Sequence, residues 1–165
     1  MRTSNKMVEL VGKFEGERLT SYKCPAGVWT IGFGTTKING RPVTQGMTIT
    51  HEQAINYLKA DLRGAENVVN ALSVKLNQNQ FDALVSFIYN CGSGNFKVST
   101  MRNKILRDPN DASIKNEFIK WNKATVKGVK TELPGLTRRR AAEAAWYVYG
   151  EESLSMGDLV VWARS

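Results

Sequence analysis

The chain of 165 residues is poor in metal-ligating side chains, with two cysteines, Cys24 and Cys91, and one histidine, His51. Structural zinc sites use four cysteine or histidine ligands at short spacings, which this sequence does not supply. We therefore predict neither a metal nor a cofactor. Both thiols are expected to be free where the chain is made, and whether they pair after release into an oxidising compartment stays open.

The sequence also lacks a long apolar segment. A membrane-spanning helix needs about 20 predominantly apolar residues, and no such run occurs. Residues 1–6 lead into an amphipathic segment and not into the apolar stretch of an export signal. We therefore expect no stable membrane insertion and a protein that stays in the cytoplasm until it is released. Only 4 prolines and 42% apolar residues are typical of a folded chain, predicted to form one domain.

Positive charge is abundant, and the formal net charge is +8 at pH 7. Such an excess favours attraction to an anionic partner: a nucleic acid, an acidic polysaccharide or a bacterial envelope. Charge alone does not choose among these partners.

Residues 15–34 combine helix, turn and strand signals around chemically capable side chains. Gly16 stands where a helix often ends in a residue of positive φ, so Glu15 is predicted to be the last helical residue. The negative end of the helix dipole and partial burial beside Phe14 both disfavour ionisation of Glu15, which suits a general acid. A solvated surface carboxylate is the alternative. The apolar residues of the preceding helix recur at helical spacing: Met7, Leu10, Val11 and Phe14.

After the turn at 25–27 the apolar period changes to two, which indicates a strand. Its bulky residues fall on one face, and its other face is mostly small and carries Thr30. A strand of this kind can bury one side while the other lines a cleft. Gly32 and Gly34 mark either the close approach of a ligand or backbone, or a β-bulge.

Glu15, Cys24 and Thr30 follow a pattern of Glu, eight residues, Asp or Cys, five residues, Thr. This pattern resembles the phage-type lysozymes or endolysins, glycoside hydrolase family 24. The resemblance covers roughly residues 5 to 150 and continues through four further segments: 80–87, 90–92, 96–100 and 134–145. Two positions depart from the commonest members. Cys24 replaces an aspartate, as in a cysteine subgroup of the family, and Thr35 stands where many members carry histidine.

The resemblance implies an α+β, lysozyme-like fold in a single domain of residues 1–165. A small antiparallel β lobe, about 15–50, is joined by a long helix to a larger helical lobe, with the active-site cleft between them. The helical lobe comprises about 51–150 plus the N-terminal helix. Residues 151–165 are left unassigned.

The same resemblance implies an inverting glycosidase in which Glu15 is the acid and Thr30 aims the attacking water. Cys24 is then a base, a nucleophile or only a residue that shapes the site. Lys23 and nearby arginines favour its thiolate, although a free thiol with a pKa of about 8.5 is largely protonated at neutral pH. Three further residues correspond to the family's sugar-contacting positions: Thr36, Tyr89 and Ser99.

We therefore predict a muramidase that cleaves the β-1,4 bond between N-acetylmuramic acid and N-acetylglucosamine of peptidoglycan, and not a nucleic-acid-binding protein. The resemblance also implies a monomer that reaches the periplasmic wall of a bacterial host through a separate holin. One rival is a lytic transglycosylase that uses Glu15 alone. The other is a non-catalytic cationic protein that binds envelope polymer or nucleic acid.

Further elements are predicted from local signals. Asn39-Gly40 predicts a two-residue hairpin turn within one sheet of residues 22–48. A capping box at 50–53 begins a helix that continues to about residue 72, with Gly64 inside it as a position where the helix can bend. Residues 79–89, apolar almost all round, predict a buried central helix.

Towards the C-terminus, Ser99 is predicted to cap a short helix and residues 122–132 to form a loop. Thr137 is predicted to cap a last helix ending at Tyr149. Residues 138–140 are three arginines in its first turn, where cations oppose the helix dipole and need a partner. That partner is Glu15, a substrate carboxylate, or Glu143 with solvent.

Overall fold

The computed structural model describes residues 1–155. Contacts divide the described chain into two compact units, residues 5–63 and residues 1–4 together with 64–155. The N-terminal helix therefore belongs with the small sheets, whereas the sequence grouped it with the other helices. Of the unassigned tail, residues 156–165 lie outside the described part.

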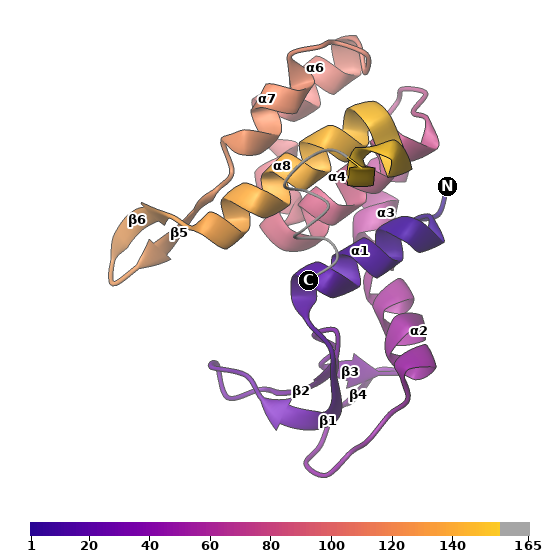
Figure 1. Cartoon of the computed structure of the whole chain (residues 1–165), viewed down its shortest axis with the longest axis vertical. Coiled ribbons are helices and arrows are strands. Elements are labelled where there is room, and N and C mark those ends of the chain that lie inside the picture. The colour runs from indigo at the N-terminus through magenta and orange to yellow at the C-terminus, as the bar shows by residue number, and fades with distance from the viewer. Residues whose placement is uncertain (156–165) are drawn as a thin grey trace. The chain divides into compact units, whose positions relative to one another are not determined.

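The unit of residues 5–63 contains two helices and four short strands (Figure 1): α1 (Asn5–Glu15), β1 (Arg18–Lys23), β2 (Trp29–Gly32), β3 (Lys37–Ile38), β4 (Arg41–Pro42) and α2 (His51–Asp61). Helix α1 ends as predicted, because Gly16 has a φ of +78° and its N–H donates to Gly12 O at 2.9 Å. The predicted capping box at Thr50 and Gln53 is also confirmed at the start of α2.

The predicted single sheet is wrong in one respect, since β1 pairs with β2 and β3 pairs with β4 in two separate sheets. The predicted turn at Asn39-Gly40 joins β3 to β4, with positive φ at both residues. Strand β2 stops at Gly32, where a φ of +67° turns the chain so that Ile31 and Thr35 exchange two backbone hydrogen bonds of 2.9 Å.

Gly32 also explains how closely α2 packs on this turn. A Cβ atom built at Gly32 would lie 3.3 Å from the Cβ of Ala54, in the first turn of α2. Of the two alternatives predicted for the strand glycines, the close approach occurs at Gly32, where the approaching element is a helix. The pairing of β1 with β2 is also irregular beside it, between the pairs Arg18–Gly32 and Tyr22–Thr30.

The predicted helix of residues 51–72 is interrupted at Leu62, so that α2 is followed by a separate α3 (Arg63–Asn70). Leu62 is fully buried, and its ψ of −12° is far from the helical value near −42°, although its N–H still donates to Leu58 O. The break lies two residues before Gly64. The boundary between the two units, between Arg63 and Gly64, is therefore next to it.

The second unit is mainly helical. It contains α3, α4 (Gln78–Cys91), α5 (Ser93–Lys97), α6 (Thr100–Arg107), α7 (Ile114–Ile119), β5 (Lys123–Val126), β6 (Val129–Glu132), α8 (Pro134–Tyr149) and a 3-10 turn (Gly150–Ser155). Helix α4 is buried along most of its length, which confirms the predicted central helix. Phe87 of α4 makes edge-to-face contacts with Phe96, Phe118 and Trp121.

Residues 1–4 are tied into this helical unit by buried carboxylates. The N–H and hydroxyl of Thr3 both donate to Glu66 Oε2 at 2.7 Å, and the N–H of Ser4 donates to Asp82 Oδ1 at 3.0 Å. Burial raises the pKa of Asp82, although the hydrogen bonds from Ser4 oppose that shift.

Two predictions near the C-terminus are wrong. Residues 122–132 contain a β-hairpin instead of a loop, because Lys127 and Gly128 both adopt positive φ and form a tight turn. Helix α8 begins at Pro134 and not after Thr137, since proline fits the first helical turn, where its missing N–H needs no partner. The three arginines consequently lie in the second turn of α8.

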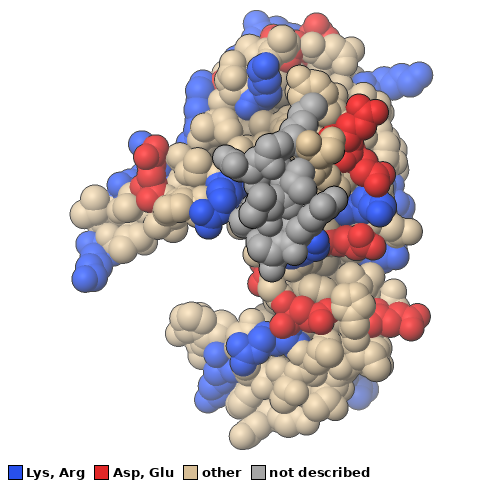
Figure 2. Space-filling view, viewed as in Figure 1, with Lys and Arg blue, Asp and Glu red and all other residues tan. Residues whose placement is uncertain are grey.

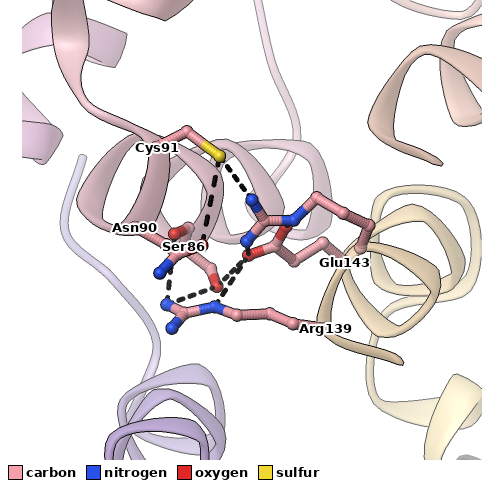
Figure 3. A network of polar contacts seen from close by, with 6 residues as sticks. Ser86, Asn90, Cys91, Arg139 and Glu143 are labelled. Atoms are coloured by element: carbon pink, nitrogen blue, oxygen red, sulfur yellow. Dashed lines mark hydrogen bonds and ion pairs between the residues drawn. The ribbon is translucent and has the colours of Figure 1, made fainter. Parts of the chain in front are cut away.

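A buried charge network joins α4 to α8 (Figure 3). Glu143 Oε1 lies 2.7 Å from Arg140 Nε, and Glu143 Oε2 lies 3.3 Å from Arg139 Nε. Ser86 of α4 donates its hydroxyl to Glu143 Oε2 at 2.5 Å, and Arg139 donates to Ser86 O at 3.3 Å. Glu143 is therefore the counter-charge for two guanidinium groups that are almost wholly buried.

We expect Glu143→Gln to lower the free energy of unfolding by about 3–5 kcal/mol, because it leaves two buried cations without their carboxylate. Urea unfolding monitored by circular dichroism measures this loss. Glu9→Gln, at an exposed position of α1, is the control and should change little. An unfolding midpoint for Glu143→Gln equal to that of the control would show that the network does not hold α4 to α8.

Candidate active site

The β1–β2 hairpin brings Cys24 and Thr30 to one face. Tyr22 pairs with Thr30 and Lys23 with Trp29, and the turn is closed by the N–H of Cys24, which donates to Val28 O at 3.0 Å. Because side chains alternate along a strand, Cys24 and Thr30 share a face and Lys23 points to the opposite one.

Hydrogen bonds lower the pKa of the Cys24 thiol below its ordinary value. The backbone N–H of Val28 has the largest effect. Burial, the second largest, opposes it, and the N–H of Ala26 and the Thr30 hydroxyl add smaller effects in the same direction as Val28. The sequence assigned this role to Lys23 and nearby arginines, but no cation is among the causes of the shift. The Nζ of Lys23 lies 5.5 Å from the centre of the Trp29 ring instead. The turn backbone, and not a neighbouring cation, therefore favours the thiolate.

The Thr30 side chain is buried, and its hydroxyl donates to Val28 O at 3.0 Å. A hydroxyl has one proton and two lone pairs, so it donates to either Val28 O or the Cys24 sulfur while it still accepts from a third group. That arrangement suits a residue that orients a water molecule.

Glu15 is exposed at the end of α1, so the partial burial expected beside Phe14 does not occur. Two residues on, Glu17 forms an ion pair with Nδ1 of His51, which lies in the first turn of α2 as predicted. Glu17 thus links the end of α1 to α2.

Thr35, the second departure from the family pattern, is a buried structural residue. Its hydroxyl donates to Asp61 Oδ2 at 2.6 Å and so fixes the turn after β2 to the end of α2. Partial burial raises the pKa of Asp61, and the bond from Thr35 opposes that shift. The sequence carried no signal for this pairing, because the two residues are 26 positions apart.

The predicted sugar-contacting residues differ in their surroundings. Thr36 is exposed, and Tyr89 is half-buried on α4 in the second unit. Ser99 is buried, and its hydroxyl donates to Phe96 O at 2.7 Å and accepts from the N–H of Arg102 at 3.1 Å. It caps α6 as the sequence predicted, which leaves its hydroxyl little capacity to contact a sugar.

Residues 12–143 match the family model described as phage lysozyme. The chain belongs to the phage lysozyme family. An endolysin of Acyrthosiphon pisum secondary endosymbiont phage 1 is 41% identical over 149 residues, which cover 89% of this chain and 98% of the relative. A SAR-endolysin of Haemophilus phage HP1 is 32% identical over 156 residues, 87% of this chain and 80% of the relative.

The fold agrees with this membership. The solved endolysin from Escherichia coli O157:H7 phage FAHEc1 superposes with a TM-score of 0.83 and 42% identity, covering 90% of this chain and 94% of that one. The chain is therefore an α+β lysozyme and a glycoside hydrolase.

A pocket of about 410 Å³ lies beside the end of α1, and neither Glu15, Cys24 nor Thr30 lines it.

Residues 1–155 contain no group of acidic, histidine or cysteine side chains that could hold a metal ion. In the same residues no helix is long and apolar enough to cross a membrane.

In this lysozyme we expect Thr30→Val to raise the pKa of Cys24, because it removes a hydroxyl that hydrogen-bonds the thiolate without changing side-chain volume. The rate of alkylation by iodoacetamide against pH, in a Cys91→Ser background, gives the midpoint of the titration. The midpoint should move to higher pH in Thr30→Val and stay in place in Thr36→Val. An identical midpoint in all three proteins would contradict the hydrogen bond between Thr30 and Cys24.

Proposed function

We propose that this lysozyme is an endolysin that hydrolyses the β-1,4 bond between N-acetylmuramic acid and N-acetylglucosamine in peptidoglycan, with Glu15, Cys24 and Thr30 as its catalytic residues. The observation that supports it best is the shared face of Cys24 and Thr30 together with the lowered pKa of the thiol. The family pattern supplies the third member, Glu15, at the end of α1.

In the proposed mechanism the Glu15 carboxyl donates its proton to the leaving glycosidic oxygen as the bond to the anomeric carbon breaks. A water molecule held by the Thr30 hydroxyl attacks that carbon from the opposite face. The Cys24 thiolate accepts the proton of this water, so one water is consumed and the anomeric configuration inverts. No metal or cofactor takes part.

The proposed contacts to the substrate come from the family pattern and from the net charge. Thr36, Tyr89 and Ser99 are the candidate sugar contacts, and Ser99 is the least favoured because its hydroxyl caps α6. The net charge of +8 favours approach to an anionic wall polymer. We infer a monomer that stays in the host cytoplasm until a separate holin lets it reach the periplasmic wall.

We expect Glu15→Gln to abolish the clearing of turbid cell suspensions while the protein stays folded, because general acid catalysis typically contributes about 10² to 10⁴-fold. Glu17→Gln is the matched control, since the amide still accepts a hydrogen bond from His51 and should be mild. Near-normal clearing by a folded Glu15→Gln protein would overturn the assignment of the acid.

Cys24→Asp should retain substantial activity, and Cys24→Ser should retain little, because a serine hydroxyl is too weak a base at neutral pH. Alkylation should inactivate the wild-type enzyme and a Cys91→Ser variant alike, which assigns the effect to Cys24. Full activity in a folded Cys24→Ser protein would leave Glu15 as the essential group and favour the transglycosylase alternative.

Expression of this chain alone should leave cells intact until chloroform disrupts their inner membrane, if a holin is required for release. Culture turbidity before and after chloroform measures this. The Glu15→Gln variant is the control, because it should not lyse cells under either condition. Prompt lysis without chloroform would instead indicate that the chain is exported by itself.

A further inference from the structure

The β5–β6 hairpin has no face packed against a core. All residues of both strands are exposed except Ala124, which is half-buried. Figure 1 shows that the hairpin extends away from α7 and α8 of its own unit. A two-stranded hairpin is only marginally stable alone. Because this one buries almost none of its side chains, a role in packing does not explain its presence.

The base of the hairpin is nevertheless firmly anchored. Asn122 is buried, and its Nδ2 donates to Glu132 Oε1 at 3.3 Å and to Thr137 Oγ1 at 3.1 Å. The N–H of Leu133 donates to Asn122 O at 3.0 Å, next to the first residues of α8. These bonds fix the direction of the hairpin, so it is a defined arm and not a loose loop.

The register gives the hairpin two chemically different faces. Thr125 pairs with Lys130, and Lys123 with Glu132, on one face. The other face carries the pairs Ala124–Thr131 and Val126–Val129, with Val126 42% and Val129 65% exposed. Lys127 occupies the turn, and Figure 2 shows basic atoms at the outer end of the hairpin.

We propose that residues 123–132, here named the substrate arm, bind the peptidoglycan strand on which this enzyme acts. The three lysines, against one glutamate, match the carboxylates of the stem peptides. The valine face offers shallow apolar contact to the C–H surfaces of the sugars. A lipid anchor would need larger side chains such as Trp, Phe or Leu, which the arm does not have.

The proposal rests on the proposed function and is tested by binding, in the non-cleaving Glu15→Gln background. The arm variant combines Lys123→Gln, Lys127→Asn and Lys130→Gln, with asparagine chosen because it tolerates the positive φ of residue 127. The control variant removes the same charge from exposed lysines elsewhere in this unit: Lys75→Gln, Lys97→Gln and Lys115→Gln.

Co-sedimentation with purified sacculi at low salt should show about tenfold weaker binding for the arm variant than for the control variant, as three lost surface ion pairs imply. The difference should vanish on sacculi whose carboxylates have been converted to neutral amides with a carbodiimide and ammonia. Urea midpoints should be equal, and Val126→Ser with Val129→Ser should weaken binding without a change of charge.

Equal binding of the arm and control variants, or a difference that persists on the amidated sacculi, would overturn the proposal. Arm-dependent binding to vesicles of anionic lipid without arm-dependent binding to sacculi would do the same. Failure of the proposed function has a separate readout, because it appears as an absence of cleavage by the wild-type enzyme and leaves these binding results unaffected.

Discussion

The register of the β1–β2 hairpin is the constraint on which the proposed chemistry depends. With Lys23 opposite Trp29, the turn begins at Cys24, and the N–H groups that lower its pKa are those of Val28 and Ala26. A shift of one residue would move Cys24 to the face of Trp29 and separate it from Thr30. The side chain and the backbone that activates it are thus positioned by one short hairpin.

The two units of the chain are stabilised by different kinds of interaction. In the helical unit two buried arginines pair with Glu143 within α8, and Ser86 of α4 is hydrogen-bonded to both Glu143 and Arg139. This network fixes α8 against α4. The unit of residues 5–63 is held by individual contacts, among them the Thr35–Asp61 hydrogen bond and the close packing of Gly32 on Ala54. Both contacts fix the turn that follows β2.

Local signals predicted much of this fold because they depend on neighbours in the sequence. The end of α1 at Gly16, the turn at Asn39-Gly40 and the caps at Thr50 and Ser99 are confirmed. The break at Leu62 was missed, since helical periodicity continues through it. The pairing of Thr35 with Asp61 depends on tertiary contact, which a single sequence does not encode in its spacing. Glu143, in contrast, lies three residues after Arg140 on α8 and is one of the partners that the sequence predicted for the arginines.

The central claim is that the enzyme hydrolyses its substrate with an external water. Mass spectrometry of muropeptides released in heavy-oxygen water tests it most directly, because the attacking water becomes part of the new end of the chain. We predict reducing N-acetylmuramic acid ends that carry one heavy oxygen atom. Unlabelled 1,6-anhydro ends, one water lighter, would contradict the account and assign the reaction to a transglycosylase.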